Sequence, residues 1–106
     1  DNIVNTPLRA GTTGPEFRKA IERDWIPAVE KFKPRILFVS AGFDAHTADP
    51  LGDIHLEEDD FTWITRLIVS LAAEHCEGRV VSTLEGGYNL DALARSVAAH
   101  LKALAA

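Results

Sequence analysis

The sequence predicts an α/β fold around a parallel sheet, with its elements in the order helix, strand, helix, strand, helix. Two short apolar runs, at residues 36–39 and 80–84, are typical of buried strands. A segment with helical periodicity separates them, and each run is followed by a loop that carries glycine and polar residues. Because the connecting helix forms a crossover between the strands, we expect the strands to be parallel and the crossover to be right-handed.

The first helix is predicted to begin at Pro15. Prolines and glycines break any regular pattern before it, so residues 1–14 are expected to be extended and rich in turns. Pro27 lies inside the helical pattern and lacks a backbone N–H, which predicts a kink or a break near Ile26. The apolar residues that share one face of this helix are Phe17, Ile21, Trp25, Ala28, Val29 and Phe32.

The first strand is predicted at residues 35–40. Its run of apolar residues is typical of a strand that is buried on both faces of a parallel sheet. A long loop is expected at residues 41–56. Four acidic residues at 57–60 then favour the first turn of a helix, where the helix dipole stabilises negative charge. The buried stripe of this second helix is predicted to be Phe61, Ile64, Ile68, Leu71 and Ala72.

The second strand is predicted at residues 79–84, after Gly78 ends the connection. The remaining residues form an amphipathic helix. Its predicted apolar face consists of Leu90, Leu93, Ala94, Val97, Ala98, Leu101 and Leu104. At 106 residues, the chain is long enough for one small domain with a modest core.

The composition narrows the class of protein. A net charge of −5 argues against direct nucleic-acid binding, which needs a basic face, and is compatible with cationic substrates. No apolar stretch is long enough to span a membrane, and no secretory signal is visible, so we expect a cytoplasmic protein. The single cysteine, Cys76, excludes an internal disulfide and is expected to be a packed thiol. Because the chain begins at Asp1 and contains no methionine, we expect it to be a piece of a longer protein.

Candidate chemistry follows each predicted strand. Because the carboxyl ends of parallel strands meet at one edge of a sheet, the loops at 40–52 and 85–90 are expected to lie together. The spacing of Asp44, His46 and Asp49 suits a divalent metal, although aspartates in loops more often bind nearby backbone N–H groups. Tyr88 could donate a hydrogen bond to a polarised carbonyl or could cover the core, and the residues alone leave both open.

Two other interpretations of these residues are weak. Ser40 lacks the glycine-flanked turn that exposes the nucleophile of a serine hydrolase. The remaining histidines stand singly in a loop and on helices, so solvated or capping roles are expected for His55, His75 and His100.

Three motifs resemble the later part of the zinc-dependent histone deacetylases. They are Ser-Ala-Gly-Phe-Asp-Ala-His at residues 40–46, Asp-Pro-Leu-Gly at 49–52 and Glu-Gly-Gly-Tyr-Asn-Leu at 85–90. The chain is similar to class II histone deacetylases and acetylpolyamine amidohydrolases over essentially its whole length. The resemblance implies an arginase-like, three-layer α/β fold, of which residues 1–106 are the C-terminal part.

The resemblance also implies a role for individual residues. Asp49 would be a zinc ligand, and the hydroxyl of Tyr88 would stabilise the oxyanion formed from the acetyl carbonyl. Asp44 and His46 would support the loop without binding zinc. The residues implied to line or border the acyl-lysine tunnel are Gly86, Gly87, Phe43 and Leu56.

The family's other two zinc ligands and its tandem histidine pair have no counterpart in these 106 residues. The resemblance implies that the parent protein deacetylates N-acetyl-lysine or acetylated polyamines. Catalytic zinc needs three protein ligands, so we expect this chain alone to be inactive and to bind Zn²⁺ weakly or not at all. The alternative is a non-catalytic, deacetylase-like binding or assembly module. Open strand edges further predict contact with the missing N-terminal part of the domain, or self-association.

Overall fold

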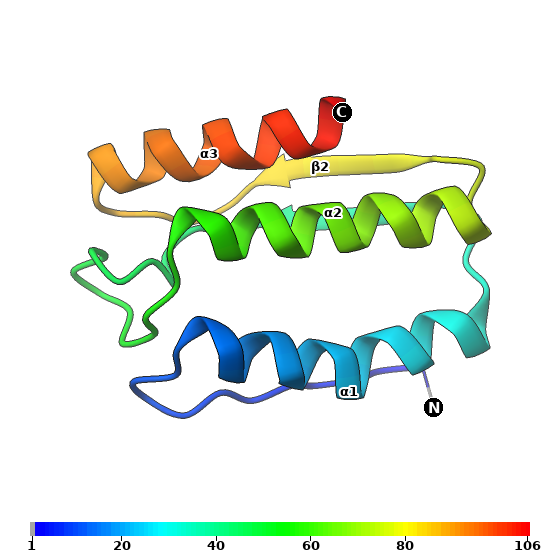
Figure 1. Cartoon of the computed structure of the whole chain (residues 1–106), viewed down its shortest axis with the longest axis horizontal. Coiled ribbons are helices and arrows are strands. Elements are labelled where there is room, and N and C mark those ends of the chain that lie inside the picture. The colour runs from blue at the N-terminus through cyan, green and yellow to red at the C-terminus, as the bar shows by residue number, and fades with distance from the viewer. Residues whose placement is uncertain (1) are drawn as a thin grey trace.

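Five elements follow one another in the order that the sequence predicts (Figure 1). The computed structural model describes residues 2–106. The three helices are α1 (Gly14–Phe32), α2 (Glu58–His75) and α3 (Leu90–Ala105), and the two strands are β1 (Leu37–Ala41) and β2 (Val80–Leu84). The predicted α/β class is therefore confirmed, and each boundary differs from the predicted one by only one or two residues. No described helix is both long and apolar enough to cross a membrane.

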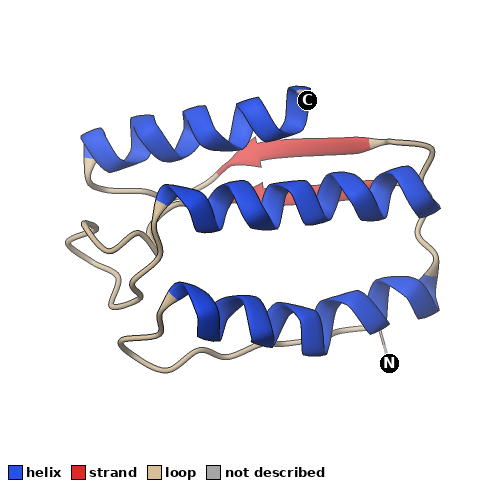
Figure 2. Ribbon diagram, viewed as in Figure 1, coloured by secondary structure: helices blue, strands red, loops and turns tan. Residues whose placement is uncertain are grey.

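The two strands pair in parallel, as the crossover predicts. The register places Leu37 opposite Val80 and Ala41 opposite Leu84, so both strands end together (Figure 2). Burial on both faces, which the apolar run of β1 predicts, is wrong for this chain because the side chain of Phe38 is 74% exposed. The apolar pattern cannot tell which faces are covered, and no described element covers this one.

The helix α1 continues through Pro27 without a break. Proline removes the N–H that would bond the carbonyl of Arg23 one turn earlier. Both Arg23 and Pro27 are exposed, so water can satisfy that carbonyl and the helix can continue. Of the predicted α1 face, Ile21 is buried, whereas Phe32 is largely exposed.

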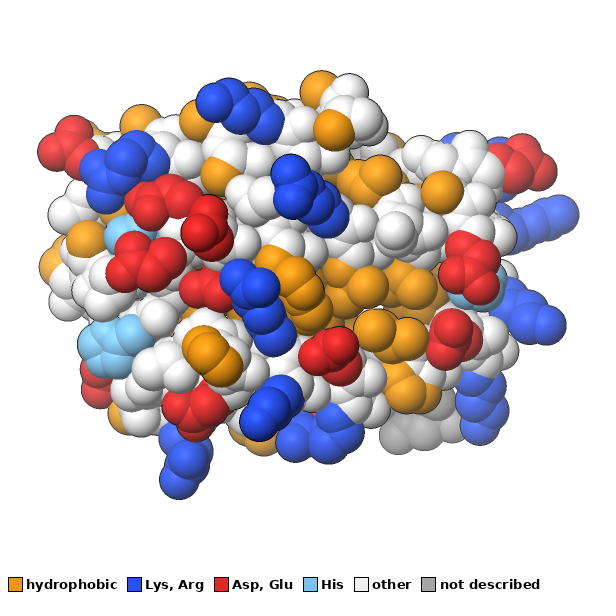
Figure 3. All heavy atoms as spheres, in the orientation of Figure 1, with side chains coloured by type: hydrophobic (Ala, Val, Ile, Leu, Met, Phe, Trp, Pro, Cys, Tyr) orange, Lys and Arg blue, Asp and Glu red, His pale blue; other side chains and the backbone are white. Residues whose placement is uncertain are grey.

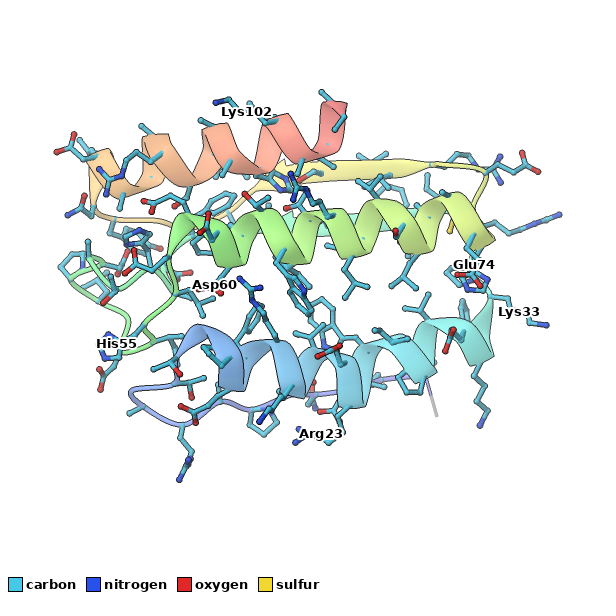
Figure 4. All side chains as sticks on the ribbon, in the orientation of Figure 1. Arg23, Lys33, His55, Asp60, Glu74 and Lys102 are labelled. Carbon is cyan, nitrogen blue, oxygen red and sulfur yellow. The ribbon has the colours of Figure 1, made fainter. Side chains whose placement is uncertain are left out.

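Asp60 joins α2 to α1 at their N-terminal ends (Figure 4). Its Oδ1 accepts hydrogen bonds from Nε and one terminal nitrogen of Arg18, at 3.1 and 3.0 Å. Its Oδ2 accepts the backbone N–H of Glu57 at 2.9 Å, which satisfies a donor at the start of α2. Glu57 is thus the capping residue, and three of the four predicted acidic residues lie in the first turn of α2.

An apolar cavity of about 340 Å³ lies between α1, β1 and α2. Figure 3 shows hydrophobic side chains gathered between the two helices on this face. The main core lies at one end of this region, where the end of β1 meets the following loop and the start of α2. It consists of Ala41, Phe43, Leu56 and Phe61. The core therefore lies directly beneath the loops at the carboxyl ends of the strands.

The predicted apolar face of α3 is only partly buried, with Leu93 and Val97 packed against the core. Leu90 and Leu101, both on the predicted apolar face, are exposed. The buried residues of α3 are Ala92, Ser96, His100 and Ala103. Because α3 packs against α2, small side chains on the contact face let the two helices approach closely.

The predicted solvated or capping role of His100 is wrong. The ring is buried among α2, β2 and α3. Its Nδ1 lies 2.8 Å from Oγ1 of Thr65, and its Nε2 lies 2.8 Å from Oγ of Ser82. The Thr65 hydroxyl donates its one hydrogen to the carbonyl of Phe61, so Nδ1 of His100 must be the donor and Nε2 the acceptor. A neutral imidazole thereby satisfies both hydroxyl partners, and the Thr65 hydroxyl satisfies the carbonyl of Phe61.

The predictions for His55, His75 and Cys76 have different outcomes. His55 is exposed, as predicted, and its Nδ1 contacts the hydroxyl of Thr47. His75 is largely buried and so is not solvated, but it lies in the last turn of α2, where the predicted capping role stays open. Cys76 is fully buried and its thiol donates to the carbonyl of Pro34, which confirms the packed thiol.

The buried imidazole of His100 predicts a pH-dependent stability. Burial lowers the pKa of His100 in the folded chain, so the unfolded chain binds a proton that the folded chain does not. Stability should fall as the pH drops below about 6.5, by up to about 1.4 kcal/mol per pH unit, and level off below the folded pKa. Urea unfolding at several pH values should show this slope reduced in His100→Gln. The exposed-site control His55→Gln should keep it, and an unchanged slope in His100→Gln would contradict the account.

Candidate active site

The two polar loops meet at the carboxyl ends of β1 and β2, as the parallel sheet predicts. The backbone N–H of Phe43 donates to the carbonyl of Gly86 at 2.8 Å. The N–H of Glu85 donates to the carbonyl of Ala41 at 2.9 Å. Residues more than 40 positions apart in sequence are thus fixed side by side, at the edge of the sheet where α/β proteins bind ligands.

The carboxylate of Asp49 bonds to both loops and is only 7% exposed. Its Oδ1 accepts the backbone N–H groups of Leu51 and Gly52, at 2.8 and 3.0 Å. Its Oδ2 accepts the backbone N–H of Tyr88 at 2.9 Å. Asp49 therefore closes its own turn with one oxygen and holds the second loop with the other.

These hydrogen bonds keep Asp49 ionised. Burial alone would raise the pKa of its carboxyl, but the N–H groups of Tyr88, Leu51 and Gly52 together outweigh burial and lower the pKa. A carboxylate offers about four lone-pair positions, two on each oxygen. The structure fills both on Oδ1 and one on Oδ2, so Oδ2 retains a position for one further bond to a cation.

Tyr88 presents its side chain to solvent beside this carboxylate. The side chain is 55% exposed, while its backbone N–H is held by Asp49. A Cβ atom added at Gly86 would lie 3.3 Å from the Tyr88 hydroxyl, so the ring folds back over that glycine. The phenol can therefore donate a hydrogen bond to a ligand bound at the mouth of the two loops.

Glycine is favoured at position 87 mainly by its backbone conformation, and a larger residue would also displace the end of the Leu93 side chain. Its φ is +142°, in a region that favours glycine. An added Cβ atom would also lie 2.7 Å from Cδ1 of Leu93, closer than carbon atoms pack. Gly86 and Gly87 are half-buried beside the loop, whereas Phe43 and Leu56 are core residues. A role for these four residues along a substrate tunnel stays a prediction.

Both ring nitrogens of His46 take part in hydrogen bonds. The ring is 3% exposed. Its Nδ1 accepts the backbone N–H of Ala48 at 3.0 Å, and its Nε2 lies 2.9 Å from Oε1 of Glu58. His46, Glu57 and Glu58 form a group whose atoms could hold an ion, but the bond between His46 and Glu58 already explains their proximity. Asp44 is exposed beside Gly86.

Glu58 and Arg95 also lie near the site, and no motif in the sequence indicates a role for them there. Nε of Arg95 donates to the same Glu58 oxygen that faces His46, at 2.9 Å. Burial would raise the pKa of Glu58, but Arg95, the residue's own backbone N–H and His46 lower it to about 2. The two residues are 37 positions apart on different helices, so no local pattern could have indicated their contact.

These features define the class of protein: an α/β fold whose paired loops form a candidate ligand site at the strand ends. A family model described as "Histone deacetylase domain" matches residues 1–104. The chain is 42% identical to the type-2 histone deacetylase 2 of Dictyostelium discoideum, over 97% of the chain and 6% of that protein. It is also 42% identical to the chloroplastic histone deacetylase 14 of Arabidopsis thaliana, over 95% of the chain and 24% of that protein.

Solved structures agree with the sequence comparisons. The crystal structure of the HDA15 HD domain superposes with a TM-score of 0.86 at 32% identity, over 94% of this chain and 27% of that one. The structure of the histone deacetylase Clr3 gives a TM-score of 0.85 at 32% identity, over 94% of this chain and 16% of that one. The chain therefore belongs to the histone deacetylase family, and it spans about a quarter or less of the length of these relatives.

Proposed function

We propose that this chain forms part of a zinc-dependent deacetylase site that hydrolyses the acetyl amide of N-acetyl-lysine or of acetylated polyamines. The observation that carries the proposal is the hydrogen bond between Oδ2 of Asp49 and the backbone of Tyr88. It joins an ionised carboxylate to an exposed phenol across the two loops that match the family motifs. The net charge of −5 suits substrates whose amines are cationic.

The residues present fit one part of a zinc site. Oδ2 of Asp49 has a free lone pair and belongs to a group that is ionised at neutral pH, as a zinc ligand must be. His46 would join it only by giving up one of its two hydrogen bonds. The remaining ligands would come from outside these 106 residues. A bound zinc ion would supply Lewis acidity toward the substrate carbonyl and water.

Tyr88 would act on the substrate oxygen. When water adds to the acetyl carbonyl, negative charge develops on that oxygen, and the phenol O–H can donate a hydrogen bond to it. The Asp49 carboxylate fixes the backbone of Tyr88 before substrate arrives, so little reorganisation is needed. The chain offers no adjacent histidines for proton transfer, since its four histidines are separate in sequence. We infer that this part of the reaction depends on residues outside the chain.

Zinc binding by the isolated chain tests the proposed division of the site. One carboxylate ligand should not hold zinc tightly, so calorimetric titration of the 106-residue chain should show no stoichiometric binding with sub-micromolar affinity. The chain should not hydrolyse an acetyl-lysine peptide either. Asp49→Asn should give the same titration as the native chain. Tight one-to-one binding by the native chain that Asp49→Asn abolishes would show that the chain holds a complete site, contrary to the proposal.

A non-catalytic module is the second candidate, because these 106 residues contain neither a tandem histidine pair nor the remaining zinc ligands. The two candidates differ in what a longer polypeptide that contains this chain should carry. A tandem histidine pair and an Asp-x-His motif upstream would favour the deacetylase. Their absence from that polypeptide would favour a binding or assembly module.

We also propose that the open sheet is covered by the rest of such a domain or by a second copy of this chain. Each strand has an unpaired edge within residues 2–106, and apolar side chains on the sheet are exposed. Sedimentation velocity should therefore show concentration-dependent association. Phe38→Lys should weaken it, whereas Leu51→Lys, at an equally exposed apolar residue in a loop, should not. A native chain that stays monomeric at high concentration would contradict cover by a second copy and leave the rest of the domain as the cover.

A further inference from the structure

We propose that Glu58 and Arg95 are positioning residues for the candidate active site, acting through His46 on the turn that carries Asp49. Their effect on catalysis rests on the proposed function, whereas their effect on the loops can be measured without it. Neither residue belongs to the motifs at 40–52 and 85–90 that indicated the site. Both reach it from helices: Glu58 from the first turn of α2, and Arg95 from the second turn of α3.

A continuous chain of hydrogen bonds connects them to Asp49. Arg95 and His46 both bond to Oε1 of Glu58, each at 2.9 Å. On the far side of the imidazole ring, the N–H of Ala48 donates to Nδ1 at 3.0 Å. The N–H of Asp49 donates to the backbone carbonyl of His46, also at 3.0 Å. His46 thus holds two successive backbone N–H groups, those of Ala48 and Asp49.

The N–H of Ala48 and the carboxylate of Glu58 both favour the same tautomer of His46. Because the N–H of Ala48 points at Nδ1, that nitrogen must be an unprotonated acceptor. The ring proton therefore lies on Nε2 and points at Glu58. An acceptor at this position favours the Nε2–H tautomer, and the bond from Arg95 holds the acceptor in place. When the Glu58 carboxylate is removed, Nε2 has no acceptor and the Nδ1–H tautomer becomes accessible. That tautomer places a donor against the N–H of Ala48 and loosens the turn.

The same network also links the two loops a second time. Asp49 already binds the backbone N–H of Tyr88. Arg95 lies on the helix that begins just after Tyr88, and this helix is capped by Asn89. The bond from Arg95 to Glu58 therefore ties α3, and with it the end of the second loop, to the residues that shape the first. Two separate bonds, one from Asp49 to Tyr88 and one from Arg95 to Glu58, therefore fix the two loops relative to each other.

The residues of this network differ in how far they are buried, and this difference distinguishes a positioning role from a role in core packing. His46 is buried and stacks near Phe61, with ring centroids 6.4 Å apart, so its removal would disturb the core. Glu58 is about one-third exposed and Arg95 more than half exposed. Substitution of these outer residues should leave the core packed, and their effect should be confined to the loops.

Amide hydrogen exchange on the 106-residue chain tests this inference. In Glu58→Ala, the N–H groups of Ala48, Leu51, Gly52 and Tyr88 should exchange about tenfold faster, because a charge-assisted bond that holds the turn is lost. Arg95→Ala should have a smaller effect in the same direction. Asp59→Ala removes an acidic residue from the same turn of α2 and should leave these amides unchanged. The amides that pair β1 with β2 should be unaffected in all three variants.

A second measurement detects the tautomer directly. The ¹⁵N chemical shifts of His46 should show a proton on Nε2 in the native chain and in Asp59→Ala, and a mixture of tautomers in Glu58→Ala. Glu58→Gln keeps an oxygen that can accept from Nε2–H, so it should restore both the tautomer and slow exchange. Equal acceleration of loop and strand amides would show a purely structural role and overturn the inference. An unchanged tautomer and unchanged loop exchange in Glu58→Ala would overturn it as well.

Turnover by a deacetylase domain that contains this chain separates the two proposals. Glu58→Ala should lower kcat, with recovery in Glu58→Gln. If the Asp49 and Tyr88 variants lose turnover, while Glu58→Ala leaves the hydrogen-exchange rates of the loop amides unchanged, the positioning role is wrong and the proposed function stands. If the domain lacks deacetylase activity while Glu58→Ala still loosens the loops and shifts the tautomer, the proposed function is wrong and the positioning of the turn stands.

Discussion

Tyr88→Phe, in a deacetylase domain that contains this chain, is expected to lower kcat by about 10²–10³-fold with little change in KM. The substitution removes one hydroxyl and keeps the ring. The backbone N–H that donates to Asp49 is retained, and the exposed side chain contributes little to the core. A donor that acts only on the developing oxyanion affects the transition state more than the bound substrate, which is why kcat should carry the loss.

Steady-state kinetics on an acetyl-lysine peptide measure this effect. His55→Gln, at an exposed position in the neighbouring loop, is the matched control and should keep native turnover. A kcat within threefold of the native value for Tyr88→Phe would rule out Tyr88 as the oxyanion donor. The phenol would then be a solvent-exposed group without a part in the reaction.

Asp49→Asn is expected to remove both bound zinc and turnover from the same domain. The amide carries no charge and replaces one carboxylate oxygen by an NH₂ group. If its remaining oxygen keeps the N–H groups of Leu51 and Gly52, the new NH₂ faces the N–H of Tyr88, so two donors oppose each other. The bond between the loops is then lost together with the metal ligand.

The zinc content of the purified domain measures this effect. Asp53→Asn makes the same chemical change at an exposed residue of the same loop and should keep both zinc and activity. Asp49→Asn should also speed hydrogen exchange at the Tyr88 amide, which reports on the loops independently of metal. One zinc per domain in Asp49→Asn would show that Asp49 is not a ligand.

Periodicity and strand order were sufficient to predict the elements, their order and the meeting of the two loops. These features depend on residues that are close in sequence, or on the general geometry of parallel sheets. Pro27 shows where a local rule fails, because an exposed carbonyl can tolerate the missing N–H. The exposure of Phe38 shows a second limit, because an apolar strand does not reveal whether a neighbour covers it.

The buried polar contacts were harder to predict. His100 follows Leu93 and Val97 at helical spacing, so its position on the buried side of α3 was visible in the pattern. Its partners Thr65 and Ser82 belong to other elements and could not be identified from the sequence. The contact between Glu58 and Arg95 is of the same kind, since it depends on how α2 and α3 pack. The motifs therefore located the site, and the packing of the helices supplied the residues that support it.

Zinc content and turnover, measured together on Asp49→Asn and Tyr88→Phe in the deacetylase domain, test most directly that these two residues have distinct roles in one site. Asp49→Asn should lose both zinc and turnover. Tyr88→Phe should keep one zinc per domain and lose turnover alone. Native turnover in both variants, or loss of zinc from Tyr88→Phe with full retention in Asp49→Asn, would contradict these roles.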